Sequence, residues 1–140
     1  LATLLLGIVL LLSDARLATL PIAVPEHPRI LWTAGQERAV HQRIRQDSLW
    51  QKLHNEIMDE CDRLTAMPPV KPRKVGRQMM DSSREVLRRV FFLSYGWRMT
   101  RRPAYLKRAE QELLAVAGYN WNSTHFLGTA ELMIATAIGY

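Results

Sequence analysis

Side chains suited to ligand chemistry are concentrated in residues 119–126, which read Tyr-Asn-Trp-Asn-Ser-Thr-His-Phe. Trp121 offers an aromatic face, Asn122 an amide that donates and accepts hydrogen bonds, and His125 an imidazole. Such groups suit a carbohydrate cleft, where aromatic faces stack on sugar rings and polar groups bind hydroxyls or carboxylates. The alternative is that these side chains only cap a helix and fill the core, and residue types alone favour this packing role.

Other patterns that carry chemistry are absent from the sequence. It has no glycine-rich phosphate loop, no Gly-x-Ser-x-Gly nucleophile elbow and no His-Glu-x-x-His zinc pattern. Cys61 is the only cysteine, so no internal disulfide is possible, and its helical context predicts a small buried side chain, not a nucleophile. His27 falls in a proline-bearing stretch, and His41 and His54 are expected to be solvated or to cap helices. Neither a metal nor a cofactor is predicted.

The positive charge of the chain is concentrated in one region. Of 140 residues, 19 are Lys or Arg and 13 are Asp or Glu, a net charge of +6. Residues 70–108 carry a net charge of +10, from twelve basic and two acidic residues, and the rest of the chain carries −4. This excess favours a polyanionic partner, with Lys71, Arg73, Lys74 and Arg77 placed to steer an acidic chain. The alternative is a solvated loop followed by arginine-rich outer helix faces.

The N-terminal residues predict export. Residues 1–12, LATLLLGIVLLL, form an uncharged run that fits the core of a secretory signal but is shorter than the about 20 apolar residues of a membrane span. Ser13 and Ala15 suit cleavage after Ala15, so residues 1–15 are interpreted as a signal peptide that lacks its first residues. The alternative is a buried core helix. We expect a secreted or periplasmic protein with no stable membrane span.

The rest of the chain divides into an extended lead, residues 16–32, and a helical region, residues 33–140, interpreted as a domain cut at its C-terminal end. Five helices are predicted, which begin at a Thr33–Gln36 capping box, at Asp47 or Ser48, near Asp81 or Ser82, at Pro103, and at Ser123 or Thr124. Because no strand alternation is present and the connections are short, the predicted class is all-α, built of antiparallel helical hairpins.

Three side-chain placements follow from the helical periodicity. The second helix should present one apolar face, formed by Leu49, Leu53, Ile57, Cys61 and Leu64. The third should bury Val86, Val90, Leu93 and Trp97, with Arg84, Arg88 and Arg89 turned away from that stripe. The last helix is almost uniformly apolar, so we expect exposed apolar surface, and hence aggregation, at Leu132, Met133, Ile134 and Ile138.

Five segments carry a further pattern, namely His27–Leu31 (HPRIL), Ser82–Tyr95 (SSREVLRRVFFLSY), Tyr105–Ala115 (YLKRAEQELLA), Trp121–Leu127 (WNSTHFL) and Ala137–Tyr140 (AIGY). In their order and spacing they resemble the N-terminal part of the heparinase II/III-like polysaccharide lyases. The resemblance covers residues 27–140 and implies the first part of an incomplete (α/α) toroid, which antiparallel β-sheet domains follow in that family. The chain departs from the family at Ser123-Thr124, often Pro-Ser, and at Gly128, often Asp.

The resemblance also implies a reaction, the β-elimination of a uronate-containing polysaccharide. The uronate carboxylate is neutralised, a base, commonly Tyr or His, removes the C5 proton, and an acid protonates the departing O4. The resemblance places the catalytic residues past residue 140, so none is assigned in this chain. It assigns Asn122 and His125 to the substrate cleft, with Trp121 as a stacking platform.

The predicted function is therefore the N-terminal part of a secreted or periplasmic lyase for acidic polysaccharide, inactive by itself. The first alternative is a basic all-α module that binds polyanions or nucleic acid without catalysis. A helical scaffold for protein partners is the second. The signal-like N-terminus and the absence of a helix-turn-helix pattern argue against nucleic acid, and the five matched segments argue against a scaffold. The expected partner is an acidic, sulfated or unsulfated, polysaccharide.

Overall fold

A computed structural model describes residues 30–76, 78–120 and 126–140 of the chain. Within these ranges 74% of the residues are helical and no strand is formed, although an isolated bridge pairs Val75 with Gln78. The predicted all-α class is confirmed. Among the described helices, none combines the length and apolar character that a membrane crossing requires.

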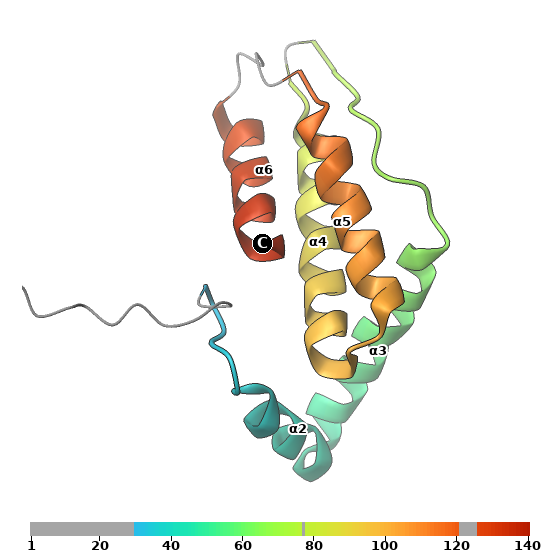
Figure 1. Cartoon of the computed structure of the whole chain (residues 1–140), viewed down its shortest axis with the longest axis vertical. Coiled ribbons are helices and arrows are strands. Elements are labelled where there is room, and N and C mark those ends of the chain that lie inside the picture. The colour runs from blue at the N-terminus through green and yellow to red at the C-terminus, as the bar shows by residue number, and fades with distance from the viewer. Residues whose placement is uncertain (1–29, 77, 121–125) are drawn as a thin grey trace, which may run out of the picture.

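Five helices make up the described structure: α2 (Glu37–Gln46), α3 (Ser48–Thr65), α4 (Met80–Thr100), α5 (Pro103–Ala117) and α6 (Phe126–Gly139). Helix α4 is the central one, since it contacts each of the other four. Figure 1 shows that α4 runs antiparallel to both α3 and α5, while α6 lies beside α4 and points the same way. The short helix α2 projects from the lower end of α3.

The helix boundaries follow local sequence signals. Asp47 caps α3, because its side chain accepts hydrogen bonds from the backbone N–H groups of Leu49 and Trp50, at 2.8 and 3.4 Å. Pro103 occupies the first turn of α5, as predicted. The predicted start of the first helix is wrong: α2 begins at Glu37, although Gln36 Oε1 does accept a hydrogen bond from the Thr33 N–H at 3.0 Å.

The apolar core consists of two clusters on opposite halves of α4. The first joins α4 to α5 and α6, and includes Val86, Val90, Val116 and Leu132. The second joins α4 to α3 and α5, and is formed by Cys61, Leu64, Leu93, Tyr105 and Ala109. The predicted burial of Cys61, Val86, Val90 and Leu93 is thus confirmed, whereas Trp97, predicted in the same stripe, is only partly buried.

Three predicted placements are wrong, each for a packing reason. Leu49 and Leu53 are 71% and 52% exposed, because the first half of α3 extends past the helices that cover its second half. Leu132 is buried, since α6 packs along α4 through this residue and Ala135, whereas Met133 and Ile134 are exposed as predicted. Arg89 is also buried and does not point away from the core.

The connection between α3 and α4, described for residues 66–76 and 78–79, contains most of the predicted basic loop Val70–Arg77 and runs along the outside of α5 (Figure 1). Buried polar groups hold it in place. The Val70 N–H donates to Glu112 Oε2 at 2.9 Å, and Tyr119 Oη donates to the Val70 carbonyl. Farther along, the Arg73 N–H donates to Ser82 Oγ at 2.9 Å. The loop therefore has a defined path although it forms no helix.

Candidate functional site

The three residues predicted to form a substrate cleft, Trp121, Asn122 and His125, lie outside the described residues. The structure describes the chain up to Asn120, just after α5, and again from Phe126, the first residue of α6. Of the predicted steering residues, Arg77 also lies outside the described part. Lys71, Arg73 and Lys74 are exposed on the loop between α3 and α4.

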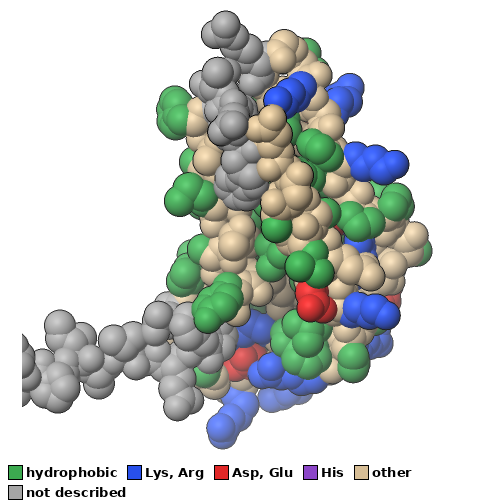
Figure 2. Space-filling model, turned by 45° about the horizontal axis from the view of Figure 1, so that its top comes forward, with side chains coloured by type: hydrophobic (Ala, Val, Ile, Leu, Met, Phe, Trp, Pro, Cys, Tyr) green, Lys and Arg blue, Asp and Glu red, His purple; other side chains and the backbone are tan. Residues whose placement is uncertain are grey.

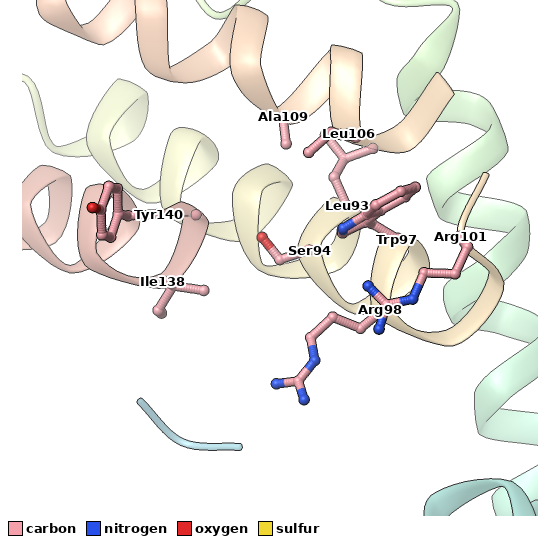
Figure 3. A pocket seen from close by; sticks show the side chains of 10 residues that line it. Leu93, Ser94, Trp97, Arg98, Arg101, Leu106, Ala109, Ile138 and Tyr140 are labelled. Carbon is pink, nitrogen blue, oxygen red and sulfur yellow. The ribbon is translucent and has the colours of Figure 1, made fainter. Parts of the chain in front are cut away.

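A groove with polar and aromatic side chains lies where α4, α5 and α6 meet, at the C-terminal ends of α4 and α6 (Figure 3). Its volume is about 240 Å³, and it is lined by Leu93, Ser94, Trp97, Arg98, Arg101, Leu106, Ala109, Ile138, Gly139 and Tyr140. Trp97 and Arg101 lie at one end, Ile138 and Tyr140 at the other, and Ser94 between them. We name these ten residues the α4–α6 groove.

The Arg101 guanidinium lies over the indole ring of Trp97, with its Cζ 5.4 Å from the ring centroid. The two residues are one helical turn apart, and Arg101 is the residue at which α4 ends. Its side chain is 63% exposed and lies 3.7 Å from Glu37 Oε1, a contact that solvent weakens. The exposed N–H groups of this guanidinium can bind a carboxylate or sulfate, and the Trp97 indole beneath it forms an apolar wall.

Arg98, the second arginine of the groove, is held by the protein through four hydrogen bonds. It donates to Glu37 Oε1 from Nε and Nη2, at 3.0 and 2.7 Å, and its guanidinium lies 4.4 Å from the centre of the Trp32 ring. Its remaining donors bind the carbonyl oxygens of Trp32, at 2.6 Å, and Thr33, at 2.9 Å. Burial alone would raise the pKa of Glu37, but the hydrogen bond from Arg98, the backbone hydrogen bonds and the charge of Arg98 together outweigh burial and lower the pKa. Arg98 thus ties residues 32–37 to α4.

The regional charge excess is largely neutralised in space. Every arginine that the structure describes in residues 70–108 lies within ion-pair distance of a carboxylate. Most of these carboxylates come from outside that region, namely Glu37, Glu60, Asp62, Glu112 and Glu131. Figure 2 shows basic side chains in separate groups, the lowest of which adjoins acidic side chains. The arginines of this region do not form one basic face.

At the centre of this network, one carboxylate joins two buried arginines. Glu112 is fully buried, and its Oε1 lies 3.0 Å from Arg89 Nη1 and 2.6 Å from Arg108 Nη2. Both guanidinium groups also donate to backbone carbonyls, Arg89 to Pro68 and Arg108 to Leu64. This cluster fastens α4, α5 and the loop to each other, so its charges are structural.

A second pair of titratable groups lies near Trp32. Nδ1 of His54, on α3, is 2.9 Å from the hydroxyl of Tyr95, on α4, and the Tyr95 ring stacks on Trp32 with centroids 5.8 Å apart. Burial, and then the nearby His41, lowers the pKa of His54, while burial, and then Cys61, raises the pKa of Tyr95. Both groups are therefore held neutral near pH 7. The expectation that His54 is solvated or caps a helix is wrong.

Neither a metal site nor a reactive thiol is found among the described residues. No group of three or more His, Cys, Asp or Glu side chains there could hold a metal ion. Burial, and then the neighbouring Asp62, raises the pKa of the Cys61 thiol to about 11, and its sulfur donates to the Phe92 carbonyl at 3.1 Å. Cys61 is therefore a packing residue, as its sequence context predicts.

Sequence reasoning did not identify Trp97 and Arg101 as residues that line a groove together. Trp97 was expected only in the buried stripe of its helix, and Arg101 only as one of many basic residues. Their spacing of four on a helix is the available signal, but it occurs by chance in many helices. No protein-family model matches the chain, and no curated protein matches it.

Proposed function

We propose that the chain is the N-terminal part of a secreted or periplasmic polysaccharide lyase, which cleaves uronate-containing polysaccharide by β-elimination. One observation carries this proposal. Seven of the ten residues that line the α4–α6 groove belong to three of the segments that resemble heparinase II/III-like lyases, Ser82–Tyr95, Tyr105–Ala115 and Ala137–Tyr140. Segments that are far apart in sequence thus meet around one groove, which supports a shared binding role.

The requirements of the reaction determine which step this chain would contribute to and which would fall to residues past residue 140. β-Elimination needs a neutralised carboxylate, a base near C5 and an acid near O4. In the proposed full-length enzyme, the base and acid lie past residue 140, and the helices described here form the first part of an incomplete (α/α) toroid. The antiparallel packing of α3, α4 and α5 is compatible with such a toroid. The present chain then contributes substrate binding and not proton transfer.

The main competing function is a non-catalytic module that grips nucleic acid or other polyanions by charge. That function needs basic groups that remain available to many phosphates or sulfates. Except for Arg101, whose contact with Glu37 is long and exposed, the described arginines of residues 70–108 are instead paired with carboxylates. Lys71, Lys74 and Lys107 are exposed and form no ion pair within the described part of the chain. Three lysines make a weaker electrostatic site than the sequence charge suggests.

The test begins with the natural reading frame and its product. We expect the frame to extend past Tyr140, and the purified product to generate the ultraviolet absorbance of unsaturated uronate from a uronate polymer such as heparan sulfate. A neutral glucan is the control substrate and should give no signal. A frame that ends at Tyr140, or a product inactive on every uronate polymer, contradicts the proposal.

The competing function, a non-catalytic module that binds polyanions, is tested with the 140-residue chain. We expect it to bind uronate polysaccharide more tightly than DNA of matched charge when both are measured at the same ionic strength, because screening weakens purely electrostatic binding. Equal, salt-sensitive affinity for both polymers would favour the non-catalytic module.

A further inference from the structure

We infer that the α4–α6 groove is a subsite for one anionic sugar residue, whose ring lies against Trp97 and whose carboxylate or sulfate is bound by Arg101. The inference rests on the proposed function and deepens it, since it names the residues that select an acidic sugar. The residues that line this groove are other than the predicted cleft residues Trp121, Asn122 and His125.

The backbone of Arg101 is the first observation behind this inference. Its φ is 57°, in the left-handed region, where a side chain is disfavoured and glycine is the usual residue at the end of a helix. Arginine therefore occupies a position at which glycine would be more stable. Strained positions of this kind persist where the side chain has a function. Here the conformation directs the guanidinium over Trp97.

The other charged side chain of the groove, Arg98, is already bound by the protein. Arg98 donates hydrogen bonds to the Glu37 carboxylate and to the carbonyl oxygens of Trp32 and Thr33. Its side chain is only 11% exposed. Glu37 in turn lies closer to Arg98, at 2.7 Å, than to Arg101, at 3.7 Å. Two arginines share this one carboxylate, so the groove keeps a net positive charge. Arg101 is the group that an incoming anion can reach.

The apolar wall of the groove is rigid. Trp97 is partly buried and packs against the second core cluster, which contains Leu93, Tyr105 and Ala109. Because its ring is held by the core and by Arg101, contact of a sugar with Trp97 costs little side-chain entropy. Figure 3 shows Ser94 in the middle of the groove and Tyr140 at the far end, where their hydroxyls can meet sugar hydroxyls.

The size of the groove limits the ligand. Its volume of about 240 Å³ lies below the range of about 300–1,000 Å³ that is typical of pockets for drug-sized molecules. One sugar ring is therefore the expected occupant, with the remainder of the polymer outside the groove. A single ring with one charge matches one aromatic face and one guanidinium.

Helix capping is the competing explanation for Arg101, since a cation near a helix C-terminus interacts favourably with the helix dipole. The two explanations predict opposite results for Arg101→Gly. If Arg101 serves the helix, the variant has a lower melting temperature. If Arg101 serves a ligand, the variant keeps or exceeds the wild-type melting temperature, because glycine relieves the backbone strain, and it loses affinity for an acidic sugar.

The experiment uses two probes, a uronate-containing disaccharide and the same disaccharide with its carboxylate reduced to an alcohol. Binding to the 140-residue chain is followed by NMR through the indole N–H of Trp97, which is assigned by its loss in Trp97→Phe. We expect the acid to shift this signal and the reduced form to bind roughly tenfold or more weakly, the value of a charge-assisted hydrogen bond. Arg101→Gly and Arg101→Gln should cause the same loss.

Lys107→Gln is the matched charge control, because Lys107 is exposed on α5, lines no part of the groove and forms no ion pair within the described residues. It should change the affinity by less than about threefold. An equal loss in the Lys107 and Arg101 variants, equal binding of both probes, or an unmoved Trp97 signal overturns the subsite. If the full-length product is an active lyase but the expected binding results are not obtained, only the subsite is rejected. If the product carries out no elimination, the proposed function is rejected.

Discussion

The carboxylate of Glu112 on α5 lies 3.0 Å from Nη1 of Arg89 on α4, and both side chains are buried. Arg108 shares the same carboxylate oxygen. Removal of one charge from a buried pair leaves its partner uncompensated in a low-dielectric interior, which costs about 3–5 kcal/mol. We therefore expect Glu112→Gln to lower the free energy of unfolding by about that amount in urea denaturation.

Glu110→Gln, on the same helix, provides the control for this change. Glu110 is exposed and forms no ion pair with a described residue, so its replacement should change the free energy of unfolding by less than about 0.5 kcal/mol. Equal effects of the two substitutions would show that the buried cluster is not a principal source of stability.

Acid should destabilise the fold through two partly buried glutamates on α3 and α4. Hydrogen bonds, from Arg63 to Glu60 and from Arg88 to Glu85, lower the pKa of each carboxyl from 4.5 to about 2. A lowered folded pKa gives stability that is complete above the unfolded value and is lost as the pH falls through the folded value. The melting temperature should therefore drop between about pH 5 and pH 2. In Glu60→Gln this drop should be smaller, and an unchanged profile would contradict the pairing.

Gly96 is a position at which α4 packs closely against Cys61 of α3 and Tyr105 of α5. A Cβ at this position would lie 2.9 Å from Cys61 Sγ and 3.1 Å from Cδ2 of Tyr105. Overpacking of this kind costs about 1–3 kcal/mol, so Gly96→Ala should lower the free energy of unfolding by that amount. The same substitution in a Cys61→Ala background should cost clearly less, since the sulfur is gone. If the double-mutant cycle shows no coupling between Gly96→Ala and Cys61→Ala, the added methyl group does not clash with the Cys61 sulfur.

The His54–Tyr95 hydrogen bond should be visible in the titration of His54. Burial, and then His41, lowers the pKa of His54 below 6.5, so the folded state favours the neutral imidazole, and the associated stability is lost as the pH falls below that value. An NMR titration should show His54 titrating below 6.5, at a pH that changes in Tyr95→Phe but not in Tyr105→Phe. A His54 pKa at its ordinary value, or one insensitive to Tyr95→Phe, would contradict the contact.

Local signals in the sequence were sufficient to predict most helix boundaries. Asp47 and Pro103 have short-range effects on the backbone, and both start helices as expected. The start of α2 was predicted four residues early, because Thr33 and Gln36 form one hydrogen bond of a capping box without helical backbone around it. The all-α class followed from the same local periodicity.

Long-range relationships could not be predicted from the sequence. Arg89 was assigned to an outer face because its buried partner Glu112 is 23 positions away and on another helix. The groove likewise depends on how the ends of α4 and α6 meet, which no local pattern encodes. The cleft predicted at Trp121, Asn122 and His125 stays a prediction, since these residues lie outside the described part of the chain.

The distribution of charge also distinguishes the helices that pack against α4. Helices α4 and α5 and the turn between them carry many more basic than acidic residues, and Glu37, Glu60 and Glu131, which pair with their arginines, lie on α2, α3 and α6. A hairpin of α4 and α5 alone would leave Arg84 and Arg98 without these carboxylate partners. Only the correct neighbour in the correct register supplies each carboxylate. The ion pairs of these arginines thus favour the native neighbours of α4 over other arrangements of the helices.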